Sequence, residues 1–147
     1  MASSGPSSAV GVTLDGVEVS AEILAKVPGE NLRVTRAAFG AVWSLAEDLG
    51  RQPGDGGAFL LGVIRTCRWL ADQPFWSQVD RRAVMPTSPY TRQQHGAMPE
   101  TIDEEYLAAV TPRGLEPGLA RGVAATLEWT WHGSARPPLD ISHAAAS

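Results

Sequence analysis

The sequence predicts a mainly α-helical protein: a small bundle of three main helices and a short fourth, with a short N-terminal β-hairpin. Three observations predict this class. Apolar residues recur at intervals of three and four along three long stretches, which is the spacing of one helix face. Gly and Pro residues separate those stretches. The 147 residues suit one domain, and 44% hydrophobic with 19% charged residues is a globular composition.

The N-terminal region is expected to form the hairpin. Valine and leucine recur over residues 10–19 around Asp15 and Gly16, and Asp-Gly favours the type I′ turn that joins two short strands. Because an isolated hairpin is marginally stable in water, it should pack on the helices or extend the sheet of a partner. The expected organisation is a disordered stretch over 1–9, a single helical domain with the hairpin over 10–139, and a disordered tail over 140–147.

The first two main helices are expected over 32–49 and 56–72, with Asn31 as the N-cap of the first. A shorter helix capped by Ser20 precedes them. The apolar face of the first main helix consists of Ala38, Phe39, Val42, Leu45, Ala46 and Leu49. That of the second consists of Leu60, Val63, Ile64, Cys67 and Leu70.

Residues 73–99 interrupt this helical pattern. Prolines punctuate the segment, and only 75–84 has the composition for one or two helical turns. Long irregular connections in a compact domain are usually functional. Beyond it, a short helix over 101–110 is expected to start with a capping box at Thr101, and the last main helix covers 116–132.

Two of these helices share a sequence pattern. GVIRTCRW, which begins at Gly62, and GVAATLEW, which begins at Gly122, place Gly, Val, Thr and Trp at the same spacing. Glycine inside a helix costs roughly 1 kcal/mol relative to alanine, so both glycines are expected at close helix–helix crossings. The pattern has two explanations: two helices that solve one packing problem, which we favour, or an internal duplication.

Composition argues against several functions. The net charge of −4 offers no broad basic surface, so we do not expect a nucleic-acid partner. The apolar stretch at 58–64 is far shorter than the roughly 20 residues of a membrane span, so we expect no membrane partner. Cys67 has no second cysteine with which to form a disulfide, and no secretion signal is recognisable, so a cytoplasmic location is expected. The bias toward arginine over lysine is typical of a GC-rich bacterial genome.

No cofactor, metal or catalytic group is predicted. His95, His132 and His143 lack the spacing of metal ligands, and the sequence contains no P-loop, dinucleotide-binding or nucleophile-elbow motif. Cys67 lies on an apolar helix face, where cysteine behaves as a small hydrophobe. The acidic run 103–105 is explained by the dipole of a first helical turn. We therefore expect a protein that is not an enzyme.

Two groups of residues are candidate contact sites. Arginine binds carboxylates and phosphates through two parallel hydrogen bonds. An arginine cluster would form if the segment after the second main helix folds back, and its members are Arg65, Arg68, Arg81 and Arg82. Aromatic and arginine residues dominate interface hot spots. The irregular segment therefore adds the candidate contacts Phe75, Trp76, Tyr90 and Arg92. The alternative for both groups is a solvated helix face and a loop whose aromatic residues cap the core.

These features favour a non-enzymatic interaction protein, an accessory or assembly subunit of bacterial origin. It would contact another protein, or a second copy of itself, through residues 74–98 and the N-terminal hairpin. A second hypothesis is a small enzyme or ligand-binding protein that holds an anionic molecule with the arginine cluster. A third is a nucleic-acid-associated regulator that docks a local arginine face on phosphate groups.

Overall fold

The computed structural model describes residues 19–51, 57–72, 86–111 and 117–140, together with the backbone of 75–77 and 82–84. The described part is mainly helical, as predicted. Its elements are α2 (Ala21–Ala25), the 3-10 helix η1 (Gly29–Asn31), α3 (Arg36–Gly50), α4 (Gly57–Ala71), β1 (Phe75–Ser77), β2 (Arg82–Val84), α5 (Pro99–Val110) and α6 (Pro117–Thr130). The predicted N-terminal hairpin and the predicted disordered ends lie outside the described residues, apart from Val19 and Asp140 at their margins.

Hydroxyl side chains cap the first two helices. The Ser20 hydroxyl accepts a hydrogen bond from the Ile23 N–H at 3.2 Å, as predicted for α2. Thr35, rather than the expected Asn31, caps α3 by accepting from the Ala38 N–H at 3.1 Å. Asn31 is fully buried in η1 instead, where its amide nitrogen donates to the backbone carbonyls of Leu70 and Ala97, both at 3.1 Å. Asn31 therefore does not cap a helix but links two segments that are distant from it in the sequence.

The short helix α5 begins before the predicted position. Pro99 is its first residue, a position that suits proline because a helix leaves its first N–H groups unpaired. Thr101 is therefore inside the first turn, and its hydroxyl accepts from the Met98 N–H at 3.0 Å. The acidic run 103–105 consequently lies beyond the first turn, so the helix dipole does not explain it.

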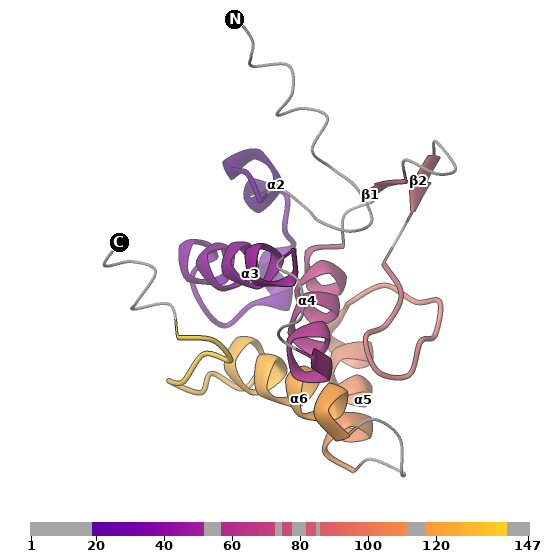
Figure 1. Ribbon diagram of the computed structural model, residues 1–147. Helices are drawn as coiled ribbons and strands as arrows, with labels where there is room; N and C mark the ends of the chain where they lie inside the picture. The colour runs from indigo at the N-terminus through magenta and orange to yellow at the C-terminus, as the bar shows by residue number, and fades with distance from the viewer. Residues whose placement is uncertain are drawn as a thin grey trace, which may run out of the picture.

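The central helix of the protein is α4, which packs against α3 on one side and α6 on another, while α5 packs on α6 (Figure 1). At the α4–α6 crossing, a Cβ atom added to Gly62 would lie 2.5 Å from the Leu119 carbonyl oxygen. A Cβ atom added to Gly122 would collide with the Phe59 carbonyl in the same way. The predicted close approach of the two glycines is therefore confirmed, and it is reciprocal.

The rest of the shared pattern is also used twice. The Thr66 hydroxyl donates to the Gly62 carbonyl at 2.7 Å, and the Thr126 hydroxyl donates to the Gly122 carbonyl at 2.8 Å. Both threonines are buried, and each hydroxyl donates its hydrogen bond to a carbonyl of its own helix. Their methyl groups are therefore free to pack against other apolar groups. Each helix therefore presents the same small face to the other.

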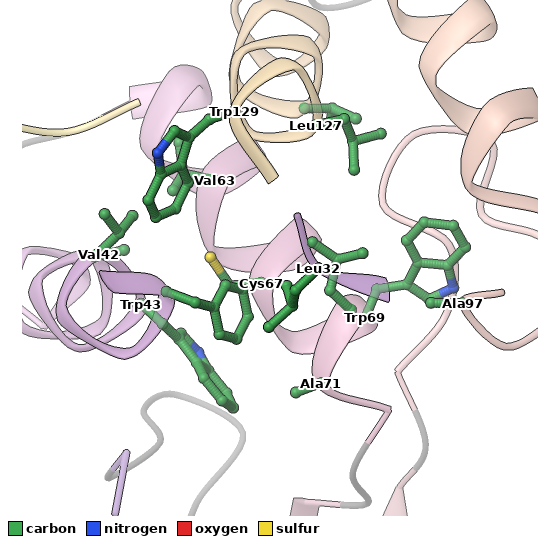
Figure 2. Packing of buried hydrophobic residues seen from close by; sticks show 14 of the residues in the cluster. Leu32, Val42, Trp43, Val63, Cys67, Trp69, Ala71, Ala97, Leu127 and Trp129 are labelled. Atoms are coloured by element: carbon green, nitrogen blue, oxygen red, sulfur yellow. The ribbon is translucent and has the colours of Figure 1, made fainter. Parts of the chain in front are cut away.

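Large aromatic side chains fill the core between the helices (Figure 2). Trp43 from α3, Trp69 from α4 and Trp129 from α6 are all buried. Trp43 and Cys67 belong to the same core cluster, and Cys67 is completely buried, as predicted. Much of the unusual tryptophan content therefore stabilises the core rather than marking a surface.

Residues 75–84 contain strands where helical turns were expected. β1 pairs with β2 in an antiparallel ribbon, with Phe75 opposite Val84 and Ser77 opposite Arg82. Aromatic and β-branched residues favour strands, and this preference outweighs the weak helical pattern of so short a stretch. Figure 1 shows the ribbon set off to one side of the helices.

Candidate binding site

The loop at residues 86–97 is anchored by one buried carboxylate. Glu105 on α5 is only 1% exposed. Its carboxylate accepts hydrogen bonds from the Thr91 N–H at 2.8 Å, from the Thr91 hydroxyl at 3.0 Å and from the Tyr90 N–H. Charge-assisted hydrogen bonds of this kind are about twice as strong as neutral ones. Glu105 therefore fixes the middle of the loop to the helix beneath it.

The loop also closes on itself. The Ser88 N–H donates to the Gln93 carbonyl at 3.1 Å, and the Gln93 N–H donates to the Ser88 hydroxyl at 2.6 Å. The Ser88 hydroxyl is also 2.8 Å from that of Thr91. Polar groups in the loop are thus paired with one another and with Glu105, which makes the loop an ordered structure despite its irregular backbone.

The end of the loop is tied to α4. The Trp69 indole N–H donates to the His95 carbonyl at 2.9 Å, and the two rings meet edge to face with centroids 5.7 Å apart. The Ala97 carbonyl accepts from buried Asn31, and the Gly96 carbonyl accepts from the Thr101 hydroxyl at 2.8 Å. The loop therefore lies along the C-terminal half of α4 before it enters α5.

The tip of this loop is exposed and strained. Residues 91–94 are all exposed. Arg92 has a φ of 65°, in the left-handed region that non-glycine residues rarely adopt. The hydrogen bonds on either side of Arg92 hold it there. Strained backbone of this kind costs of order 1–3 kcal/mol and is concentrated at functional sites.

Two of the predicted arginines have different surroundings. Arg68 is only 17% exposed and forms a two-pronged ion pair with Glu47, with both hydrogen bonds at 2.8 Å. The buried Glu47 carboxylate also accepts from the Trp43 indole N–H at 3.0 Å. Arg68 therefore does not lie on a solvated helix face, the alternative given above for the arginine cluster, because its guanidinium group binds Glu47 of α3.

Arg65, another predicted contact residue, is only partly satisfied by hydrogen bonds. One guanidinium nitrogen of Arg65, Nη1, is buried and has no hydrogen-bond partner. Burial, and secondly the positive charge of Arg92, lower the pKa of the Arg65 guanidinium below its ordinary value. The positive charge of Arg92 therefore disfavours the charged form of Arg65.

The other predicted site residues are more dispersed. Tyr90 is half-buried against the core, as a loop aromatic that caps it would be. Phe75 and Trp76 lie on β1 and Arg82 on β2, while Arg81 lies outside the described residues. The four-arginine cluster therefore stays a prediction, because Arg81 and the side chain of Arg82 lie outside the described residues.

Two acidic residues that matter were not predicted. The sequence analysis gave Glu47 no role and explained Glu105 only as part of an acidic run favoured by the helix dipole, yet both are almost completely buried and both bind polar groups far away in the chain. Their one signal is positional, because each shares a helix face with buried apolar residues: Glu47 lies four residues after Trp43, and Glu105 lies three residues after Ile102. Asp103 likewise accepts from the Trp131 indole N–H at 2.8 Å.

The described residues contain no assembled metal centre, and their one cysteine is buried. Among them, no group of three or more His, Cys, Asp and Glu side chains is placed to hold a metal ion. Burial, together with the negative charge of Glu47, raises the pKa of the Cys67 thiol, and the opposing effect of Arg68 is smaller. A thiol of this kind stays protonated and inaccessible, so it is not a nucleophile.

Comparisons with known proteins do not indicate a function, so the proposal below rests on the contacts and charges of the described residues. No protein-family model, curated protein or solved structure matches the chain. None of the helices that the structure describes is long and apolar enough to cross a membrane.

Proposed function

We propose that this chain is a non-enzymatic interaction subunit, an accessory or assembly component of a bacterial cytoplasmic complex. Its contact surface consists of the β1–β2 ribbon and the loop tip 91–94. The observation that carries the proposal is the loop tip itself. An exposed segment with a strained Arg92, held in shape by the buried Glu105 carboxylate, is organised for recognition rather than for core stability.

The β1–β2 ribbon supports the same proposal. Within the described residues each of its strands pairs on one side only. Open strand edges accept an added strand from another protein, which supplies backbone hydrogen bonds and side-chain contacts together. We therefore infer that the partner contributes an extended segment to this ribbon. Phe75, Trp76 and Arg82 belong to residue types that dominate interface hot spots.

Site-specific photo-crosslinking in the host cell tests the contact surface. A benzoylphenylalanine residue replaces Gln94 at the exposed loop tip, or Arg121 on the exposed side of α6 as the control. We expect the Gln94 position to yield one discrete crosslinked protein that the Arg121 position does not yield. The additional substitution Arg92→Glu should remove that product. Identical products from both positions, or no product from Gln94, would contradict the proposed surface.

Self-association is the second form that the interaction can take. If the partner is another copy of this chain, the crosslinked product has twice the mass of the monomer and contains only its peptides. Light scattering after size-exclusion chromatography then shows a dimer in the wild type and a monomer in Arg92→Glu. A heterologous product together with a monomeric wild type identifies a different protein as the partner.

A further inference from the structure

The outer face of α5 exposes apolar side chains. Leu107 is 62% exposed, more than any other large hydrophobic residue in the described part of the chain, and Val110 is 42% exposed. Because they are three positions apart, the two side chains are neighbours on the surface of the helix. A different face of α5 is buried, and its residues are Ile102, Glu105 and Ala109. The apolar outer face is therefore open to solvent in the described part of the chain.

In the first helix pair, α3 and α4, the matching face is covered. Counted back from the glycine of the shared pattern, Glu47 and Gly50 occupy the positions that the two exposed residues occupy in α5. Arg68 binds the Glu47 carboxylate through two hydrogen bonds at 2.8 Å. A Cβ atom added to Gly50 would lie 2.7 Å from the Ile64 Cδ1 atom. An apolar and a basic side chain, one turn apart on α4, therefore cover this face of α3.

The second helix pair lacks these two covering residues. Ala124 and Glu128 of α6 stand at the positions that Ile64 and Arg68 occupy in α4. Alanine has a much smaller side chain than isoleucine, and glutamate carries the opposite charge to arginine. The Glu128 carboxylate accepts instead from the Tyr106 hydroxyl at 2.9 Å. The neighbouring helix therefore leaves the apolar outer face of α5 uncovered.

Carboxylates lie beside the exposed apolar residues. Glu100, Asp103 and Glu104 of α5 are exposed, as is Glu128 of α6, and α5 contains no lysine or arginine. None of the four belongs to an ion pair between described residues. A negative surface attracts a positively charged partner and repels nucleic acid and anionic lipid. The charge of this surface therefore favours a basic segment of another protein.

We propose that the outer face of α5 binds an amphipathic helix of another protein that carries lysine or arginine beside large apolar side chains. The apolar residues of that helix cover Leu107 and Val110. Its basic residues lie beside Glu104 and Glu100, one and two turns before Leu107 on the same face. The combination of side chains is the one with which α4 covers α3 inside this chain. This surface is separate from the β1–β2 ribbon and the loop tip 91–94, so the inference goes beyond the proposed function.

Titration of the isotope-labelled full chain with a synthetic peptide tests this surface. The probe is an amphipathic helix with leucine on one face and lysine on the other. We expect saturable binding, with the largest changes in backbone amide NMR signals in α5. Leu107→Ser should bind at least about tenfold more weakly, because the exposed leucine is buried only in the complex. Glu104→Gln should weaken binding at low salt, with a smaller effect at high salt.

Matched controls separate this face from general stickiness. Leu61→Ser removes an exposed leucine from α4, and its affinity should equal that of the wild type. A peptide with the same leucines and with glutamate in place of lysine should not bind. Because Leu107 and Leu61 are surface residues, both serine variants should keep the thermal stability of the wild type within a few degrees.

Four results would overturn the proposal. The first is the absence of saturable binding, and the second is binding whose signal changes lie outside α5. The third is equal affinity of the wild type and Leu107→Ser. The fourth is self-association of the wild type that Leu107→Ser abolishes, because a second copy would then be the occupant. None of these results bears on the crosslink at Gln94, so this surface and the proposed function can fail separately.

Discussion

Single buried glutamates organise the polar structure of this protein. Glu47 binds Arg68 and the Trp43 indole, and Glu105 binds the backbone of the 86–97 loop. A buried carboxylate is unfavourable unless its oxygens accept hydrogen bonds, so each glutamate requires its partners to be in place. The first fastens α3 to α4. The second shapes the surface that we propose to be functional.

Cys67 provides a pH-dependent test of the core. In the unfolded chain this thiol ionises near pH 9.0, whereas burial raises its pKa in the native protein. Above that pH the unfolded chain loses a proton that the native protein keeps, so stability is complete below about pH 8 and falls as the pH rises. Between pH 8 and pH 10 the wild type should lose about 1–2 kcal/mol more stability than Cys67→Ala.

Urea unfolding at several pH values measures this difference. Cys67→Ala is less stable at every pH because it leaves a small cavity, so the slope against pH is the informative quantity. Curves for the two proteins that stay parallel from pH 8 to pH 10 would mean that the thiol ionises as readily in the native state as in the unfolded state.

At the scale of elements, the α4–α6 crossing depends on two glycines. Gly62→Ala places a methyl group against the Leu119 carbonyl and the Gly122 backbone, which cannot rotate away as a side chain could. The gain in helix propensity of roughly 1 kcal/mol is smaller than the overpacking cost, so we expect a net loss of about 2 kcal/mol. Chemical denaturation monitored by circular dichroism measures it.

Gly50→Ala is the control for that substitution. Its added methyl group would meet only the tip of the Ile64 side chain, which can change rotamer. Its effect should stay within about 1 kcal/mol. If Gly62→Ala proved as stable as Gly50→Ala, the two helices would not approach as closely as the structure shows.

The element bounds also bear on the origin of the shared pattern. The same number of residues separates α3 from α4 and α5 from α6. The pattern Gly-Val-x-x-Thr-x-x-Trp also begins at the same distance from the first residue of α4 as from the first residue of α6. Packing at a crossing explains the small residues but does not require equal spacing of the flanking helices. The element bounds thus favour internal duplication more than the local sequence pattern did.

Periodicity predicted the helices well because each has one apolar face and a length that only a helix accommodates. The predicted main helices end within a few residues of α3, α4 and α6. The prediction of helical turns at the β1–β2 ribbon was wrong, because its strands are too short for the helical and strand periodicities of apolar residues to be told apart. The roles of Asn31 and Glu105 arise from contacts between distant segments, which local patterns do not encode.

At the scale of the whole molecule, a helical scaffold carries an irregular segment between α4 and α5. The core of the scaffold includes Ala97 of that segment, and Tyr90 packs against it. The loop can hold Arg92 in an unfavourable backbone conformation because the surrounding hydrogen bonds stabilise it.

Amide hydrogen exchange at Tyr90 and Thr91 tests most directly whether Glu105 holds the loop as a fixed recognition surface. Both N–H groups donate to the Glu105 carboxylate, so in the wild type they should exchange at least about tenfold more slowly than in an unstructured peptide. In Glu105→Gln this protection should be lost while the amides of α4 keep theirs. Wild-type Tyr90 and Thr91 amides that exchange at the rate of an unstructured peptide would contradict the account.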